Sequence, residues 1–224
     1  MPAETLLPFR RDGLVDRVYD VLRSRIIFCE LEPGAKLNMD ALSREMRVSQ
    51  TPIREAINRL ASERLVLIEP YRGVRVAPLL SEAQLNDLMR ARLVIEVGAA
   101  RSADIAVPEA AATELVSRMD ELARADALDV RAFNEADAAF HRTLVAAAGN
   151  EFLLQAFDDL KAHVQIARHF LRRSSGEARE ANLEHRRILA AVRKEDRVRL
   201  QQELTAHVEG VLTRLARPTQ GDGS

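Results

Sequence analysis

The distribution of proline and glycine divides this 224-residue chain into two parts that cannot fold alike. Before residue 78, only short helices and strands can form between the residues that interrupt secondary structure, which are Pro33-Gly34, Pro52, Pro70 and Gly73. After residue 78, long stretches with helical periodicity run almost without glycine or proline to Arg217-Pro218. The sequence therefore predicts a mostly α protein whose segments are a small domain at 1–78, an all-helical domain at 79–217 and a disordered tail at 218–224.

Composition excludes several other classes of protein. With 9 Gly, 8 Pro and 1 Cys, the chain is not a collagen, a disordered protein or a disulfide scaffold. Its longest apolar stretches, such as residues 144–148, are far shorter than the roughly 20 residues that span a bilayer. The first twelve residues contain no apolar region of a secretory signal. We therefore expect a cytoplasmic protein without membrane association.

The small domain has the order of elements of a winged helix-turn-helix. Hydrophobic spacing predicts helices over 13–29 and 39–47, and a further helix that Ser49 caps. Two β-like runs follow at 65–69 and 74–77 around a turn. In such a domain the second helix of the motif enters the major groove, and its early residues meet the base edges.

This order assigns a set of candidate DNA contacts to the helix that follows residue 49 and to the turn of the hairpin. Its apolar positions, such as Ile53 and Ile57, repeat toward a core, so the polar residues between them face outward. The candidates are Ser49, Gln50, Thr51, Arg54, Asn58, Arg72 and Gly73. The alternative is a structural α/β subdomain whose arginines are only solvated.

In the helical domain, one aspartate and three histidines have the spacing of a metal site. Asp137 and His141 are four residues apart in the apolar stretch 133–148, so both project from one helical face. His185 and His207 each lie eleven residues from Asp196, which falls in the break between two predicted helices. At about 1.5 Å per residue they reach the same height in an antiparallel hairpin. The four side chains suit zinc, with nickel or manganese as alternatives. Separate surface histidines are the other interpretation.

Several phrases of the sequence resemble those of one family. Residues 14–77 resemble the winged-helix domain of GntR-type bacterial transcription regulators, in phrases such as Glu32-Pro33-Gly34-Ala35-Lys36-Leu37, Val48-Ser49-Gln50-Thr51-Pro52-Ile53-Arg54-Glu55-Ala56 and Arg72-Gly73-Val74-Arg75-Val76. Residues 81–215 resemble the helical ligand-binding domain of the FadR-like (FCD) branch. Cys29 and Arg64 replace glycines of the family, and Gln50 replaces an arginine that touches DNA. An amide at that position suits adenine better than guanine.

The resemblance implies a regulator, not an enzyme, that binds a palindromic double-stranded DNA operator as a homodimer. It places a divalent ion on the family phrase Asp-x-x-x-His, then Glu-His, then a histidine of the last helix, which maps onto Asp137, His141, His185 and His207. It also implies a small organic acid as effector.

Two residues are candidates for binding that acid, Arg92 from the family pattern and Asn134 from its place one turn before Asp137. An ion pair of Arg92 with Glu96 or Asp137 is the alternative for the arginine. For the whole protein, a regulator that responds to the ion itself and a helical metalloenzyme remain alternatives.

Overall fold

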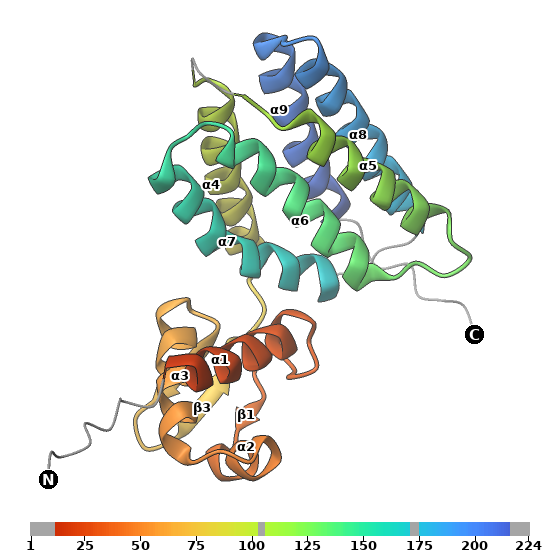
Figure 1. Ribbon diagram of the computed structural model, residues 1–224. Coiled ribbons are helices and arrows are strands. Elements are labelled where there is room, and N and C mark those ends of the chain that lie inside the picture. The colour runs from red at the N-terminus through yellow and green to blue at the C-terminus, as the bar shows by residue number, and fades with distance from the viewer. Residues whose placement is uncertain (1–11, 103–105, 171–174, 216–224) are drawn as a thin grey trace, which may run out of the picture. The chain divides into compact units, whose positions relative to one another are not determined.

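A computed structural model describes residues 12–102, 106–170 and 175–215 and confirms the predicted fold class (Figure 1). Helices dominate this part of the chain, and one small sheet accompanies them. The chain divides into two compact units, Met1–Leu79 and Leu80–Ser224. The predicted disordered tail at 218–224 lies outside the described residues.

The first unit is a winged helix-turn-helix. Its elements in chain order are α1 (Asp12–Ile27), β1 (Lys36–Leu37), α2 (Met39–Met46), α3 (Gln50–Ser62), β2 (Val66–Glu69) and β3 (Gly73–Val76). The sheet is antiparallel with the order β1-β3-β2, and Glu69 pairs with Gly73 at the turn of the hairpin. Strand β1 was not predicted, because a strand of two residues is too short to show an alternation of apolar and polar side chains.

Apolar residues at helical spacing hold this unit together. Leu22 of α1 and Ile53 and Leu60 of α3 are fully buried where the two helices pack against each other. Burial of each such side chain contributes about 1.5–3 kcal/mol. Ser49 has the backbone conformation of a helix N-cap, but its side chain makes no capping hydrogen bond, so that part of the prediction is wrong. Without this bond, the start of α3 depends on packing of its buried first turn.

Among the described residues of the second unit, all regular elements are helices. They are α4 (Glu82–Ala100), α5 (Glu109–Arg124), α6 (Val130–Ala146), α7 (Glu151–Phe170), α8 (Ser175–Arg193) and α9 (Arg197–Leu215). Helices α8 and α9 pack side by side after a tight turn, as the predicted hairpin requires (Figure 1). Helix α6 contacts α4, α5 and α7. Among the described residues, no helix is both long and apolar enough to cross a membrane.

Caps and apolar clusters fix these helices around a polar centre. Ser81 and Gln84 form a reciprocal capping box at the start of α4, and the Asp129 side chain caps α6 by accepting a hydrogen bond from the backbone of Ala132. One apolar cluster includes Phe140 and joins α5, α6, α8 and α9, whereas a second includes Val208 and joins α4, α7 and α9. Both residues are direct chain neighbours of predicted metal ligands, so apolar side chains border the site from two directions.

Candidate metal centre and DNA-binding face

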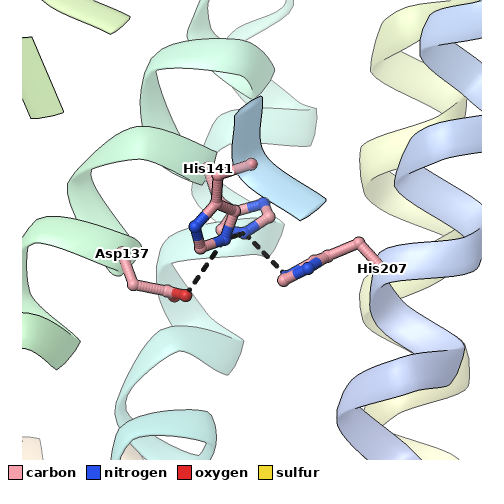
Figure 2. Close-up of side chains that lie close together, drawn as sticks. Asp137, His141 and His207 are labelled. Atoms are coloured by element: carbon pink, nitrogen blue, oxygen red, sulfur yellow. Dashed lines mark hydrogen bonds and ion pairs between the residues drawn. The ribbon is translucent and has the colours of Figure 1, made fainter. Parts of the chain in front are cut away.

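The structure brings the four predicted ligands together inside the second unit. Asp137 and His141 project from α6, His185 from α8 and His207 from α9, and all four side chains are buried. One ligand atom from each lies within 4.8 Å of the others. In Figure 2 the side chains of Asp137, His141 and His207 point toward one common centre from two helices. The eleven-residue spacing about Asp196 thus predicted the convergence of α8 and α9 correctly.

Three imidazole nitrogens of the same kind meet at this centre. The Nε2 atom of His141 lies 3.1 Å from the Nε2 of His207 and 3.3 Å from the Nε2 of His185. The Nε2 of His185 is in turn 3.3 Å from Oδ1 of Asp137. With metal–ligand bonds of about 2.1 Å, neighbouring ligand atoms are separated by about 3.0 Å in an octahedron and about 3.4 Å in a tetrahedron. These three separations fall in this range, and the four ligand atoms all lie within 4.8 Å of one another.

Two carboxylates, one buried and one partly buried, lie behind two of the histidines. Nδ1 of His141 donates to Glu96 of α4 at 2.7 Å, and Nδ1 of His207 donates to Glu184 of α8 at 2.7 Å. Arg92 donates to Glu96, and Arg214 forms a two-bond pair with Glu184 at 2.7 Å for each bond. A carboxylate behind each imidazole fixes the tautomer whose Nε2 lone pair faces the ion.

The charge states of these groups follow from burial and from their partners. Burial lowers the pKa of His141 to about 4, despite the opposing charge of Glu96. Burial also lowers the pKa of His207 well below its ordinary value. For Glu184, burial alone would raise the pKa, but the hydrogen bonds from His207 and Arg214 outweigh it and hold the pKa at about 2. Near neutral pH His141 and His207 are therefore uncharged and Glu184 is ionised.

This charge distribution tests whether the site fits a metal. Because Nδ1 of both His141 and His207 carries the proton that their carboxylates accept, neither Nε2 has one, and two lone pairs face each other at 3.1 Å. Two acceptors in a buried site repel each other unless a cation lies between them. Three imidazoles and one carboxylate are a donor set for zinc, nickel or manganese. The residues present fit a divalent ion.

The third histidine lacks this support within the described residues. Nδ1 of His185 is buried and makes no hydrogen bond to them. Its ring is held instead by aromatic packing, with the centroid of Phe140 5.0 Å away. A ligand without a carboxylate behind it is less basic and less firmly oriented. His185 is thus the least supported member of the set.

Two small cavities adjoin Asp137, and the two predicted effector residues line different ones. Arg92 lines a cavity of about 20 Å³, and Asn134 lines another of about 30 Å³ together with Arg214. Arg92 forms the ion pair with Glu96 that was the alternative interpretation. However, its Nη1 and the Nδ2 of Asn134 are buried and have no hydrogen-bond partner among the described residues. Each cavity therefore contains a donor that a ligand can engage.

All candidate DNA contacts are exposed on the first unit. They are Ser49, Gln50, Thr51, Arg54, Asn58, Arg72 and Gly73. On α3 the side chain of Gln50 donates to Asp40 of α2 and accepts a 3.2 Å bond from Arg54. Gly73 has a φ of +89°, a left-handed conformation that favours glycine at the turn of the hairpin. Exposed arginine and amide side chains at the start of α3 are of the kind that can bond to base edges.

The neighbouring Arg59 has a different role. Its guanidinium binds Asp16 of α1 at 2.6 Å and lies 4.0 Å above the ring of Tyr19. Tyr19 and Arg23 both donate to Glu63, directly after α3. The two helices are thus joined by a polar cluster at the surface. Arg59 belongs to the support of α3 and is not one of its free donors.

The two departures from family glycines occur at left-handed backbone positions. Cys29, after α1, has a φ of +56°, and Arg64, after α3, has a φ of +59°. A side chain in this region costs about 1–2 kcal/mol relative to right-handed backbone. Both residues thus keep the turn that glycine would make, with added strain.

The sequence pattern did not predict that Glu96 and Glu184 bind the histidines. Glu96 appeared only as an ion-pair partner of Arg92, and Glu184 only as the residue before His185. Spacing could have indicated the role of Glu184. Glu184 and His185 are adjacent in the chain, so their side chains leave α8 in different directions. One of the two therefore points toward α9 when the other points into the centre.

Comparisons with known proteins agree with both units. Residues 14–76 match the family of bacterial regulatory proteins called the gntR family, and residues 87–210 match the FCD domain. Two solved structures share the fold, each at 22% sequence identity. A GntR regulator from Rhodococcus sp. RHA1 gives a TM-score of 0.80 over 92% of this chain and 100% of its own. McbR/YncC from Escherichia coli gives 0.78 over 90% and 96%.

Curated relatives have regulatory names. The HTH-type transcriptional repressor RspR of Escherichia coli is 28% identical over 87% of this chain and 86% of its own length. The Nta operon transcriptional regulator of Aminobacter aminovorans is 31% identical over 73% and 77%. The gluconate operon transcriptional repressor of Bacillus licheniformis is 31% identical over 65% and 59%.

A winged helix-turn-helix followed by an FCD domain defines a class of bacterial transcription regulator. This chain belongs to the GntR family, in the group with an FCD domain. It is a DNA-binding transcription regulator, and its family and relatives indicate regulation rather than an enzymatic activity.

Proposed function

We propose that this regulator binds its operator with an affinity that a small organic acid controls, and that the acid binds at a divalent ion held by Asp137, His141, His185 and His207. The observation that carries this proposal is the meeting of the Nε2 atoms of His141 and His207 at 3.1 Å, while the Nδ1 atom of each ring contacts a carboxylate. A divalent cation between the two Nε2 atoms relieves the repulsion of their lone pairs in a buried site. Zinc suits the four ligands, with nickel or manganese as alternatives.

The effector is proposed to complete the coordination of the ion. An octahedral ion with four protein ligands keeps two positions, which the oxygens of a carboxylate fill. Arg92 and Asn134 each have a buried donor atom without a partner among the described residues, and each lines a cavity that Asp137 also lines. A guanidinium next to the ion favours a carboxylate over a neutral ligand.

The first unit is proposed to contact DNA through the exposed residues of α3 and of the hairpin turn. Ser49, Gln50, Thr51, Arg54 and Asn58 would lie along the major groove, with Arg72 and Gly73 at the turn. One such unit makes few contacts, so a homodimer on a two-fold symmetric operator is expected. A protein with this partner acts in the cytoplasm, where the bacterial chromosome lies.

One observation favours a second candidate, in which the ion itself is the signal. The cavities of about 20 and 30 Å³ have room for only one or two water-sized groups before the protein adjusts. A regulator that senses only the ion needs no more space than this. The two candidates differ in whether acids act on metal-loaded protein.

The test is operator affinity at fixed salt, measured for zinc-loaded and chelator-treated protein with and without a panel of hydroxy, keto and dicarboxylic acids. The proposal expects an acid to shift the affinity of zinc-loaded protein at least about fivefold, in line with typical coupling energies. His185→Ala should abolish the shift and lower the zinc content, whereas His163→Ala, another histidine of the same unit, should not. Acids that act equally on chelator-treated protein would show that the ion is structural. A shift with zinc alone would identify the ion as the signal.

A further inference from the structure

The cavity beside Arg92 has a lining that distinguishes among organic acids. It lies between α4, α6 and α7, and its polar side is formed by Arg92, Lys161, Gln165 and Asp137. Its remaining wall consists of Phe157, Leu160 and Val164 of α7, together with Ala138. The cavity is thus polar at one end and hydrocarbon along α7.

The polar end is suited to a single carboxylate. Arg92 is 2% exposed, and its Nη1 has no hydrogen-bond partner among the described residues, while its Nε donates to Glu96. Lys161 adds a second cation, and Gln165 adds an amide that is 6% exposed. With Asp137 bound to a divalent ion, this end carries a net positive charge. An anion can therefore form charge-assisted hydrogen bonds at this end, which a neutral ligand cannot form.

The other cavity beside Asp137 is less suited to an anion. Two carboxylates, Asp137 and Glu177, line it. Its one cation, Arg214, already forms a two-bond ion pair with Glu184. The acid should therefore place its carboxylate at Arg92, and its remaining atoms should lie along the hydrocarbon wall on α7.

That wall offers nothing to hydroxyl groups. Phe157 and Val164 are 4% and 7% exposed, so a hydroxyl placed against them loses water without gaining a partner. The spacing of Phe157, Leu160 and Val164 at i, i+3 and i+7 presents one continuous apolar face. At about 20 Å³ the cavity admits only one or two carbon groups without rearrangement.

We infer that the effector is a short aliphatic monocarboxylate, not a polyhydroxy acid, and that Lys161, Gln165 and Val164 determine this choice. The inference rests on the proposed function, because it specifies the acid that binds at the same ion. Lys161 and Gln165 bind the carboxylate with Arg92. Val164 and its neighbours on α7 contact the hydrocarbon part.

Calorimetric titration of the full-length, zinc-loaded protein tests this assignment, with propanoate, butanoate and gluconate as probes. Butanoate is expected to bind at least about tenfold more tightly than gluconate, which presents several hydroxyls to the same wall. Val164→Thr keeps the shape of the side chain but adds a hydroxyl, and it should weaken butanoate at least threefold. The matched control is Val94→Thr, since Val94 is 72% exposed on α4 and should leave every affinity unchanged.

A second pair of variants tests the polar end. Lys161→Met should weaken the binding of all three acids, because it removes a positive charge near each carboxylate. Lys194→Met should weaken the binding of none, since Lys194 is exposed directly after α8. If no acid binds the zinc-loaded protein, the proposed effector function and this assignment both fail. If acids bind but gluconate equals or exceeds butanoate, or Val164→Thr leaves butanoate unchanged, only the assignment to aliphatic acids is overturned.

Discussion

Glu184→Gln tests whether the carboxylates behind the histidines control the ion. Glu184 accepts a 2.7 Å hydrogen bond from Nδ1 of His207 and holds Arg214 through two more. Glutamine has the same shape and still offers one oxygen, but it has no charge. The substitution therefore leaves the four ligands in place and changes the group that orients His207 and pairs with Arg214.

The expected loss follows from the bonds involved. A hydrogen bond to a charged acceptor contributes about 1.5–3 kcal/mol, compared with about 0.5–1.5 kcal/mol for a neutral one, so the His207 bond weakens by about 1–1.5 kcal/mol. Loss of a negative charge near a divalent ion adds to this value. Replacement of such partners in other metal sites lowers affinity by about 10–100-fold, or about 1.4–2.7 kcal/mol. We expect the same range for zinc here.

The assay is competition for zinc against a chromophoric chelator at neutral pH. Glu180→Gln is the control, because Glu180 is exposed on α8 one turn before Glu184. Unpairing of Arg214 will lower stability with or without zinc, so the second readout is the zinc-induced rise in melting temperature, which should shrink by about 3–10 °C. A folded Glu184→Gln protein with the zinc affinity of the wild type would refute the reasoning.

Two further predictions concern the first unit. Arg54→Ala should weaken operator binding by about 1–3 kcal/mol in gel-shift titrations at fixed salt, whereas Arg59→Ala, on the same helix but bound to Asp16, should lower stability and leave DNA affinity within about threefold; equal losses from both would contradict the assignment of this face. Cys29→Gly and Arg64→Gly should each raise the free energy of unfolding by up to about 1 kcal/mol, because glycine relieves left-handed strain at some cost in unfolded-chain entropy. Urea denaturation measures this change, and a loss of stability in both variants would contradict it.

The convergence of the four candidate ligands was predictable because helical geometry is regular. The four-residue step from Asp137 to His141 and the equal distances of His185 and His207 from the turn at Asp196 depend only on rise and rotation per residue. No comparable rule connects Glu96 to His141, since they lie on different helices 45 residues apart. Their contact depends on how α4 packs against α6, which the sequence pattern does not specify.

The same limit applies to the DNA-binding face. The apolar repeat of α3 predicted which residues are exposed, but not which of them are engaged with neighbours. Arg54 and Arg59 are both exposed arginines on this helix. Only the tertiary placement of α1 against α3 brings Asp16 and Tyr19 to Arg59, whereas Arg54 bonds to Gln50 of its own helix.

Arg92 shows why the two interpretations left open by the sequence do not exclude each other. Its Nε donates to Glu96, and Glu96 accepts from Nδ1 of His141, whose Nε2 faces the centre. The guanidinium thus lines the proposed acid cavity and also supports a carboxylate behind a candidate metal ligand. An acid that pulls Arg92 away from Glu96 leaves that carboxylate to act more strongly on His141. For an acid bound as proposed, acid and ion binding are therefore coupled through one chain of hydrogen bonds, and each must change the affinity of the other by the same factor.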